Sequence, residues 1–114
     1  MSQCVFCDII AGLRPSQQVY ADEQVTAFRD IHPVAPTHIL IVPNKHIASV
    51  NDLTAEDEPL AGHLFNVAHR LAEVEGIHES GYRLIVNTGA HAGQAVYHLH
   101  LHMIGGQRMR YPMG

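Results

Sequence analysis

The stretch that decides the fold is His98-Leu99-His100-Leu101-His102-Met103-Ile104, in which three histidines alternate with apolar residues. Because successive side chains of a β-strand point to opposite faces, this alternation predicts a strand with one buried apolar face. The three imidazoles then share the other face. Imidazoles placed in this way serve as metal ligands, as a nucleophile with supporting groups or as a proton relay, and they also occur as an incidental polar face. On a straight strand about 13 Å separate the Cα atoms of His98 and His102, so one ion would reach two of the three more easily than all three.

A glycine-rich loop leads into this strand. Residues 87–95 read NTGAHAGQA and follow an apolar run at residues 82–86. Glycine lets the backbone approach an anion closely, so the turn formed by Gly93, Gln94 and Ala95 is a candidate phosphate cradle. Taken alone, such a loop is also typical of an ordinary hairpin connection.

The string from Gly93 to Gly106 resembles the signature of the histidine triad (HIT) family of nucleotide-binding proteins. Residues 30–43, which read DIHPVAPTHILIVP, resemble the other characteristic segment of that family, and the N-terminal start and the closing residues 111–114 are similar to its Hint branch. The resemblance covers essentially the full chain. It implies a HIT-like fold, with a single HIT domain over residues 1–114.

The order of elements along the chain independently predicts an α+β fold. Runs of strands interrupted by one main helix favour an antiparallel sheet, here of about five strands, with one long helix and a short N-terminal helix. Thr54 and Asp57 stand in positions typical of a capping box at the start of the long helix. The expected helices are Val5 to Ala11 and Thr54 to Glu75, and the expected strands are Gln18 to Tyr20, Val25 to Phe28, His38 to Val42, Tyr82 to Val86 and Val96 to Ile104.

Composition limits the functions that the chain can serve. A chain of 114 residues buries on the order of 65% of its unfolded surface and needs no disulfide for stability. The formal net charge of −4 provides no basic surface for a nucleic acid polymer, although a mononucleotide remains open as a ligand. No apolar run of about 18 residues and no charged-then-apolar leader are present, so we expect a cytoplasmic protein without membrane attachment.

The two cysteines form a C-x-x-C pair, Cys4 and Cys7. Two cysteines in a chain expected to be cytoplasmic indicate metal or redox chemistry more than a structural disulfide, and no strand precedes the pair as it does in most redox motifs. The resemblance implies that His46 and His98 complete a four-ligand site. Such a closed site would hold a structural Zn²⁺ ion. The alternative is that both cysteines are merely small, half-buried residues.

The resemblance also implies a mechanism, nucleotidyl transfer through a covalent intermediate. His100 would attack the α-phosphorus of a purine nucleoside 5′-phosphoramidate or an acyl-adenylate, and water would then cleave the nucleotidyl-histidine. His102 and the backbone of the Gly93–Ala95 turn would hold the phosphate oxygens. His98 and His38 would orient the His100 ring, and catalysis would require no cofactor.

For the nucleoside, the resemblance implies that Asp30 binds the ribose, that Phe6 and Ile31 contact the base, and that Asn87 contacts the sugar–phosphate end. Each residue has a simpler interpretation, because Asp30 and Asn87 are common turn residues and Phe6 and Ile31 are common core residues. The remaining histidines are expected at surface or structural positions, with one beside the site: His32, His63, His69, His78 and, in the glycine loop, His91.

One residue departs from the pattern. Many members of the Hint branch have a hydroxyl residue after Gly-Gln that assists the leaving group, whereas this chain has Ala95. Since an amine expelled from phosphorus needs a proton, we expect weaker activity on basic amine leaving groups and less effect on acyl-adenylates.

Two other functions stay open beside the hydrolase. The protein could be a nucleotide-binding or zinc-binding interaction module in which His100 is catalytically idle, or a dinucleoside polyphosphate hydrolase of another HIT branch. Composition does not decide the oligomeric state. The resemblance implies a homodimer, with the long helix and a strand at the interface and residues 107–114 reaching toward the partner's site.

Overall fold

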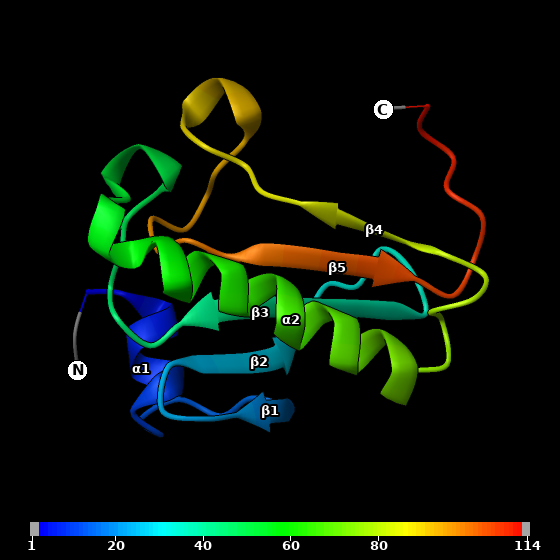
Figure 1. Ribbon diagram of the computed structural model, residues 1–114, viewed down its shortest axis with the longest axis horizontal. Coiled ribbons are helices and arrows are strands. Elements are labelled where there is room, and N and C mark those ends of the chain that lie inside the picture. Colours follow the sequence, from blue (N-terminus) through cyan, green and yellow to red (C-terminus); the bar gives the residue numbers. More distant parts are fainter. Residues whose placement is uncertain (1–2, 113–114) are drawn as a thin grey trace.

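The computed structural model describes residues 3–112 and contains one antiparallel sheet with strand order β1-β2-β3-β5-β4 (Figure 1). The predicted α+β architecture, with five strands, one long helix and a short N-terminal helix, is confirmed. The helices are α1 (Val5–Ile10) and α2 (Glu58–Val74), and the strands are β1 (Gln18–Ala21), β2 (Val25–Arg29), β3 (Thr37–Pro43), β4 (Tyr82–Ile85) and β5 (Leu101–Gly105).

The two faces of the sheet carry different elements. Helix α2 crosses one face, as Figure 1 shows, and its apolar side packs on alternate residues of the central strands, such as Ile39 and Ile41. The intervening strand residues, Leu40 and Val42, point to the opposite face and pack with Phe6 of α1. The candidate site residues lie on this second face, because the alternation places them there.

Helix α2 begins and ends at residues that favour those positions. Thr54 and Asp57 form the predicted capping box, and a 3₁₀ turn (Ala55–Asp57) precedes the α-helical part. Pro59 lies in the first turn, where its missing N–H is least costly. Gly76, with φ of +71°, follows the last turn. Within residues 3–112 no helix is both long and apolar enough to cross a membrane.

The predicted strand Val96 to Ile104 is wrong in its first half, because β5 begins only at Leu101. Upstream of Leu101 the backbone leaves the ladder with β3: the Leu99 N–H donates to the Ile47 carbonyl at 2.7 Å, and the Pro43 carbonyl accepts from the His98 ring at 2.8 Å. The alternation nevertheless continues, since Leu99, Leu101 and Met103 all lie in the core under α2. His98 and His100 therefore precede the strand but stay on the same side as His102.

Candidate active site and metal cluster

Four histidines from two neighbouring segments meet on the sheet face away from α2. In the ladder of β3 with β5, His38 lies opposite Ile104, next to His102. The ring centroids of His38 and His102 are 5.2 Å apart, and those of His100 and His102 are 4.9 Å apart. His98 is fully buried and His100 nearly so. The pairing of β3 with β5 thus places His38 beside His102, and the continued alternation keeps His98 and His100 on the same side.

Hydrogen bonding determines which nitrogen of His100 can react. His100 Nδ1 lies 2.7 Å from the His98 carbonyl oxygen. A carbonyl only accepts, so Nδ1 carries the proton and the lone pair of the neutral ring lies on Nε2. Phe6 packs edge-on against this ring, with centroids 5.2 Å apart. The arrangement holds His100 with Nε2 as its nucleophilic atom.

A second chain of hydrogen bonds determines the tautomer of His102. The Val34 N–H donates to His38 Nδ1 at 3.2 Å, so neutral His38 carries its proton on Nε2. That Nε2–H donates to His102 Nδ1 at 2.9 Å. The proton of neutral His102 therefore lies on Nε2, and this ring can donate a hydrogen bond to an oxygen. His38 thus orients His102, whereas the His98 carbonyl orients His100.

Burial keeps these rings neutral. It lowers the pKa of His38 and of His98 below the usual value for histidine. Burial, together with repulsion from the charged forms of His100 and His38, lowers the pKa of His102 to about 4. At neutral pH the tautomers assigned to His38 and His102 therefore hold.

Of the expected nucleoside-binding residues, Asp30 and Phe6 contact this cluster. Asp30 Oδ1 accepts the His32 N–H at 2.8 Å, and Asp30 Oδ2 lies 3.4 Å from His38 Nε2. Ile31 is 83% exposed, whereas Phe6 is buried against the histidines. Asn87 follows β4, where the glycine-rich loop begins. Phe6 thus packs against the histidines, whereas Ile31 presents an exposed apolar side chain.

The glycine-rich loop uses most of its own hydrogen-bonding groups. The Gly93 N–H donates to the Ala90 carbonyl and the Gln94 N–H to the Gly89 carbonyl. The Gln94 side chain is buried, donates to the carbonyls of Ala48 and Val96 at 2.8 and 3.1 Å, and accepts the Gly89 N–H at 2.9 Å. Within residues 3–112 only the Ala95 N–H of the expected cradle has no acceptor. The expected phosphate cradle therefore offers one free backbone N–H, that of Ala95, and not the three that the sequence indicates.

The four expected metal ligands come together. Ligand atoms of Cys4, Cys7, His46 and His98 all lie within 4.8 Å of one another. His98 Nδ1 is 3.3 Å from Cys4 Sγ, 3.5 Å from Cys7 Sγ and 3.2 Å from His46 Nδ1. Since His98 Nε2–H donates to the Pro43 carbonyl, the Nδ1 lone pair faces the cluster.

The chemistry of this donor set suits zinc. Two sulfurs and two imidazole nitrogens make a closed tetrahedral site. In the metal-free cluster, burial and the neighbouring Cys4 raise the pKa of the Cys7 thiol to about 11, so metal binding would displace a proton there. A cavity of about 620 Å³, lined in part by Cys4, Cys7, His46 and Ala95, connects the cluster with the outside.

Several groups that shape the site were not found from the sequence. The Val34 N–H, the Pro43 carbonyl and the His98 carbonyl are backbone groups, so no residue type marks them. The sequence also did not predict a second group of potential metal ligands, formed by Asp30, His38 and His102.

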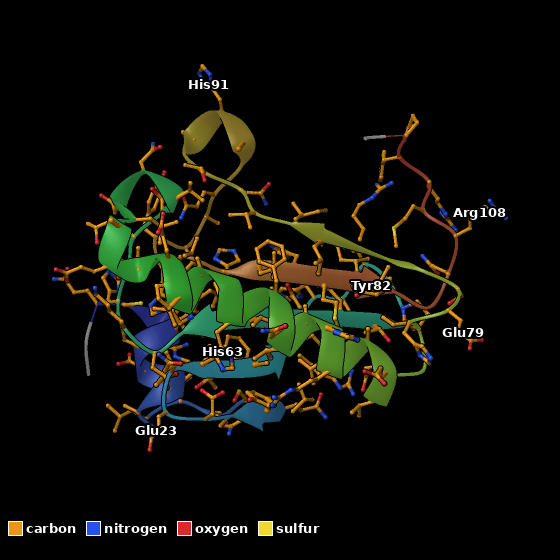
Figure 2. The ribbon with its side chains drawn as sticks, in the orientation of Figure 1. Glu23, His63, Glu79, Tyr82, His91 and Arg108 are labelled. Carbon is orange, nitrogen blue, oxygen red and sulfur yellow. The ribbon has the colours of Figure 1, made fainter. Side chains whose placement is uncertain are left out.

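The other histidines occupy different surroundings. His91 projects from the tip of the glycine loop, away from the body of the molecule (Figure 2). His63 of α2 binds Asp22 at 2.7 Å, whereas His69 and His78 are exposed beside glutamates.

The fold and the site together define the chain as an α+β protein of the histidine-triad class. A family model described as the HIT domain matches residues 12–109. The chain therefore belongs to the HIT domain family.

Individual relatives agree with this assignment. Purine nucleoside phosphoramidase of Escherichia coli is 55% identical over 105 residues, which cover 92% of this chain and 88% of that protein. A HIT family hydrolase from Legionella pneumophila has a structure that superposes with a TM-score of 0.95 at 47% identity, covering 98% of this chain and 100% of the other. A Zn-bound histidine triad family protein from Mycobacterium smegmatis superposes with a TM-score of 0.82 at 31% identity, covering 92% and 76% of the two chains.

Proposed function

We propose that the protein hydrolyses purine nucleoside 5′-phosphoramidates to the nucleoside monophosphate and the amine, through a covalent nucleotidyl-His100. The observation that carries this proposal is the 2.7 Å contact of His100 Nδ1 with the His98 carbonyl, which leaves Nε2 as a lone-pair donor. The similarity to the phosphoramidase of Escherichia coli supports the choice of substrate. Acyl-adenylates, whose acyl phosphate bond is cleaved at the same phosphorus, fit the same site.

The reaction has two displacements at phosphorus. In the first, the His100 Nε2 lone pair forms a bond to the α-phosphorus while the P–N bond breaks and the amine leaves with a proton taken from solvent water. In the second, a water oxygen attacks the phosphorus, the P–Nε2 bond breaks, and the water gives up a proton. His102, fixed as an Nε2–H donor, stabilises the phosphate oxygens in both steps together with the Ala95 N–H.

The nucleoside would bind beside these groups. Asp30 has a carboxylate oxygen, Oδ2, on the side of His38, where the two ribose hydroxyls can donate to it. The exposed Ile31 would cover the purine, with Phe6 packed against the histidines, and Asn87 would meet the sugar–phosphate end.

The direct test is intact-protein mass spectrometry after brief mixing with adenosine phosphoramidate, with released AMP assayed in parallel. The parent should show a transient adduct of one nucleotidyl group and turn over, and His100→Ala should do neither. His91→Ala removes an exposed imidazole that points away from the body of the molecule and is the matched control (Figure 2). Binding without adduct or turnover in the parent would instead favour the interaction module. Faster cleavage of a diadenosine polyphosphate than of the phosphoramidate would favour the other HIT branch.

We further propose that Cys4, Cys7, His46 and His98 hold a structural Zn²⁺ ion and that catalysis itself needs no cofactor. The four donors within 4.8 Å support the site, and the Zn-bound relative is consistent with it. Zinc measured by atomic absorption should approach one ion per chain. It should fall sharply in Cys4→Ser, whereas chelation of magnesium should leave turnover unchanged.

A homodimer and a cytoplasmic location complete the proposal. Strand β4 is at the edge of the sheet, so its outer backbone groups are open to pairing with a second copy. Phe65 of α2 is 54% exposed and Tyr97 is 51% exposed, which provides apolar surface for such a contact. Residues 107–114 would then shape the leaving-group end of the partner's site, although Met113 and Gly114 lie outside the described residues. Sedimentation equilibrium should give twice the chain mass, and Phe65→Asp should shift it toward the monomer.

A further inference from the structure

The two cysteines of the metal cluster are placed to react with each other. Cys4 is the N-cap of α1, and its Sγ accepts the Cys7 N–H at 3.3 Å. Side chains three residues apart at a helical turn have Cβ atoms about 5–6 Å apart, and a disulfide needs about 3.5–4.5 Å. Because Cys4 has extended backbone angles, φ −102° and ψ 114°, rotation at this residue can close the gap without unwinding α1.

A small oxidant can reach this pair. Both cysteines line the cavity of about 620 Å³ that opens beside His46, and His46 itself is exposed. The fourth member of the cluster, His98, is fully buried and lies behind the sulfurs. The cysteines and His46 therefore form the accessible side of the cluster, and the buried His98 forms its inner side, two residues before His100.

We propose that Cys4 and Cys7 form a reversible disulfide in competition with the metal ion, and that His100 responds to this exchange through His98. With a peroxide as oxidant, one thiol is oxidised to a sulfenic acid as the O–O bond breaks and one water is released. The second sulfur then attacks the sulfenic sulfur, the S–S bond forms and a second water leaves. A dithiol reductant reverses the change. The effect on catalysis rests on the proposed hydrolase and the loss of metal on the proposed zinc site, whereas disulfide formation rests on neither.

The route from the cluster to His100 is short. His98 has three attachments: Nδ1 to the cluster, Nε2–H to the Pro43 carbonyl, and its own carbonyl to His100 Nδ1–H. Phe6, which stands between the two cysteines in the sequence, also packs on both rings, with centroids 6.0 Å from His98 and 5.2 Å from His100. Loss of the sulfurs removes one attachment of His98 and moves Phe6. The donor–acceptor alignment at His100 then loosens.

The chemical part of the proposal is tested without any assay of activity. Metal-free and zinc-loaded protein are treated with hydrogen peroxide, and intact mass and released zinc are measured. The metal-free protein should lose two hydrogens, about 2 Da, and regain them with dithiothreitol. The oxidised form should no longer bind zinc at an equivalent concentration, and loaded protein should oxidise more slowly. Absence of the mass change, or unchanged zinc binding by the disulfide form, would overturn the proposal.

The coupling is tested by steady-state kinetics and by imidazole ¹⁵N NMR on the same samples. Oxidation should lower kcat by about tenfold with little change in KM, and the His100 Nδ1 signal should shift, because orientation changes more than binding. Cys7→Ser cannot form the disulfide, but it keeps every methionine and so controls for methionine oxidation by peroxide. This variant should show the same kcat before and after peroxide. A disulfide form with unchanged kcat and an unchanged His100 signal would overturn the coupling. A parent protein without turnover in any state would instead overturn the proposed hydrolase, while mass and zinc results would still decide the disulfide.

Discussion

At the scale of single residues, the chemistry depends on backbone groups that fix proton positions. The His98 carbonyl holds the proton of His100 on Nδ1, and the Val34 N–H holds the proton of His38 on Nε2. His100 thereby has its lone pair on Nε2, as the proposed nucleophile requires, and its neighbour His102 has an Nε2–H that can donate a hydrogen bond. The same tautomers restrict His102 as an acid. If it gave up its Nε2 proton, the chain through His38 could not replace it without leaving an imidazolate.

Because His102 is a poor proton donor, the residue at position 95 matters for protonation of the leaving amine. An amine must be protonated as it leaves, and neither His102 nor the methyl group of Ala95 readily supplies a proton. We expect Ala95→Ser to raise kcat on an alkyl phosphoramidate by about tenfold and to change kcat on an acyl-adenylate little. Stopped assays of released AMP with both substrates measure the ratio. An unchanged ratio would contradict this role of residue 95.

Gln94 is a second residue whose role is clear only from its contacts. Its buried amide joins the glycine loop to Ala48, so Gln94→Leu leaves the part-buried Ala48 carbonyl and the Gly89 N–H without these partners. We expect a loss of about 1–3 kcal/mol in the free energy of unfolding and faster amide exchange across residues 89–95. Urea denaturation and hydrogen exchange measure the two effects. The control is Gln17→Leu at an exposed position, and equal losses in both variants would contradict the assignment.

At the scale of elements, a polar network attaches α2 to the hairpin of β1 and β2. Asp22 accepts from Tyr20 at 2.6 Å, from His63 at 2.7 Å and from the N–H groups of Gln24 and Val25. Burial alone would raise the pKa of Asp22, but these hydrogen bonds hold the pKa well below its usual range. The carboxylate is therefore more stable in the folded protein than in the unfolded chain.

This pKa predicts the pH dependence of stability. Because the folded pKa is the lower one, the stabilisation is fully present above the unfolded pKa of about 4 and is lost as the pH falls toward the folded value. Asp22→Asn should cost about 1–3 kcal/mol at pH 6 and progressively less below pH 4. Urea denaturation of both proteins across this range measures the difference. A constant difference at all pH values would show that the charge is not responsible.

Two glycines illustrate how backbone geometry stabilises individual elements. Gly106 follows β5 with φ of +90°, and a Cβ there would lie 3.0 Å from Pro36 Cβ. Gly62 lies in the exposed part of α2, and a Cβ there would meet nothing within 4 Å. We expect Gly106→Ala to destabilise by about 1 kcal/mol or more, and Gly62→Ala to stabilise by about 0.5–1 kcal/mol. Thermal melts of the two variants should move in opposite directions, and shifts of the same sign would contradict the argument.

At the scale of the whole molecule, the proposed zinc site joins three segments that are distant in the sequence. Cys4 and Cys7 come from the start of the chain, His46 from the segment after β3, and His98 from the segment before β5. An ion bound only by the folded chain stabilises it by mass action, by about 4 kcal/mol at a thousand times Kd. Removal of zinc by a chelator should therefore lower Tm by about 10 °C or more. Differential scanning calorimetry measures this shift, which should vanish in Cys7→Ser, and an equal shift in that variant would exclude the cluster as the cause.

Much of this architecture could be predicted from local sequence. Capping at Thr54, the glycine at position 76 and the apolar spacing of residues 60–74 defined α2, and the alternation of residues 99–103 defined which side of β5 is buried. The start of β5 could not be predicted this way. It depends on the Pro43 carbonyl and the Ile47 carbonyl, which receive donors from a segment more than fifty residues away.

The sequence by itself determined the fold class, the side of the sheet that carries the imidazoles and the residue types that can react, because side-chain periodicity and capping act over a few residues. Tertiary structure alone decided which nitrogen of each imidazole carries the proton, that the Gln94 side chain bonds within the loop and to Ala48, and that His98 contacts both the cysteines and His100. These features arise where backbone groups from distant segments meet. The identity of a residue does not show which backbone groups it will contact, and only the folded chain brings the donors and acceptors within hydrogen-bond distance.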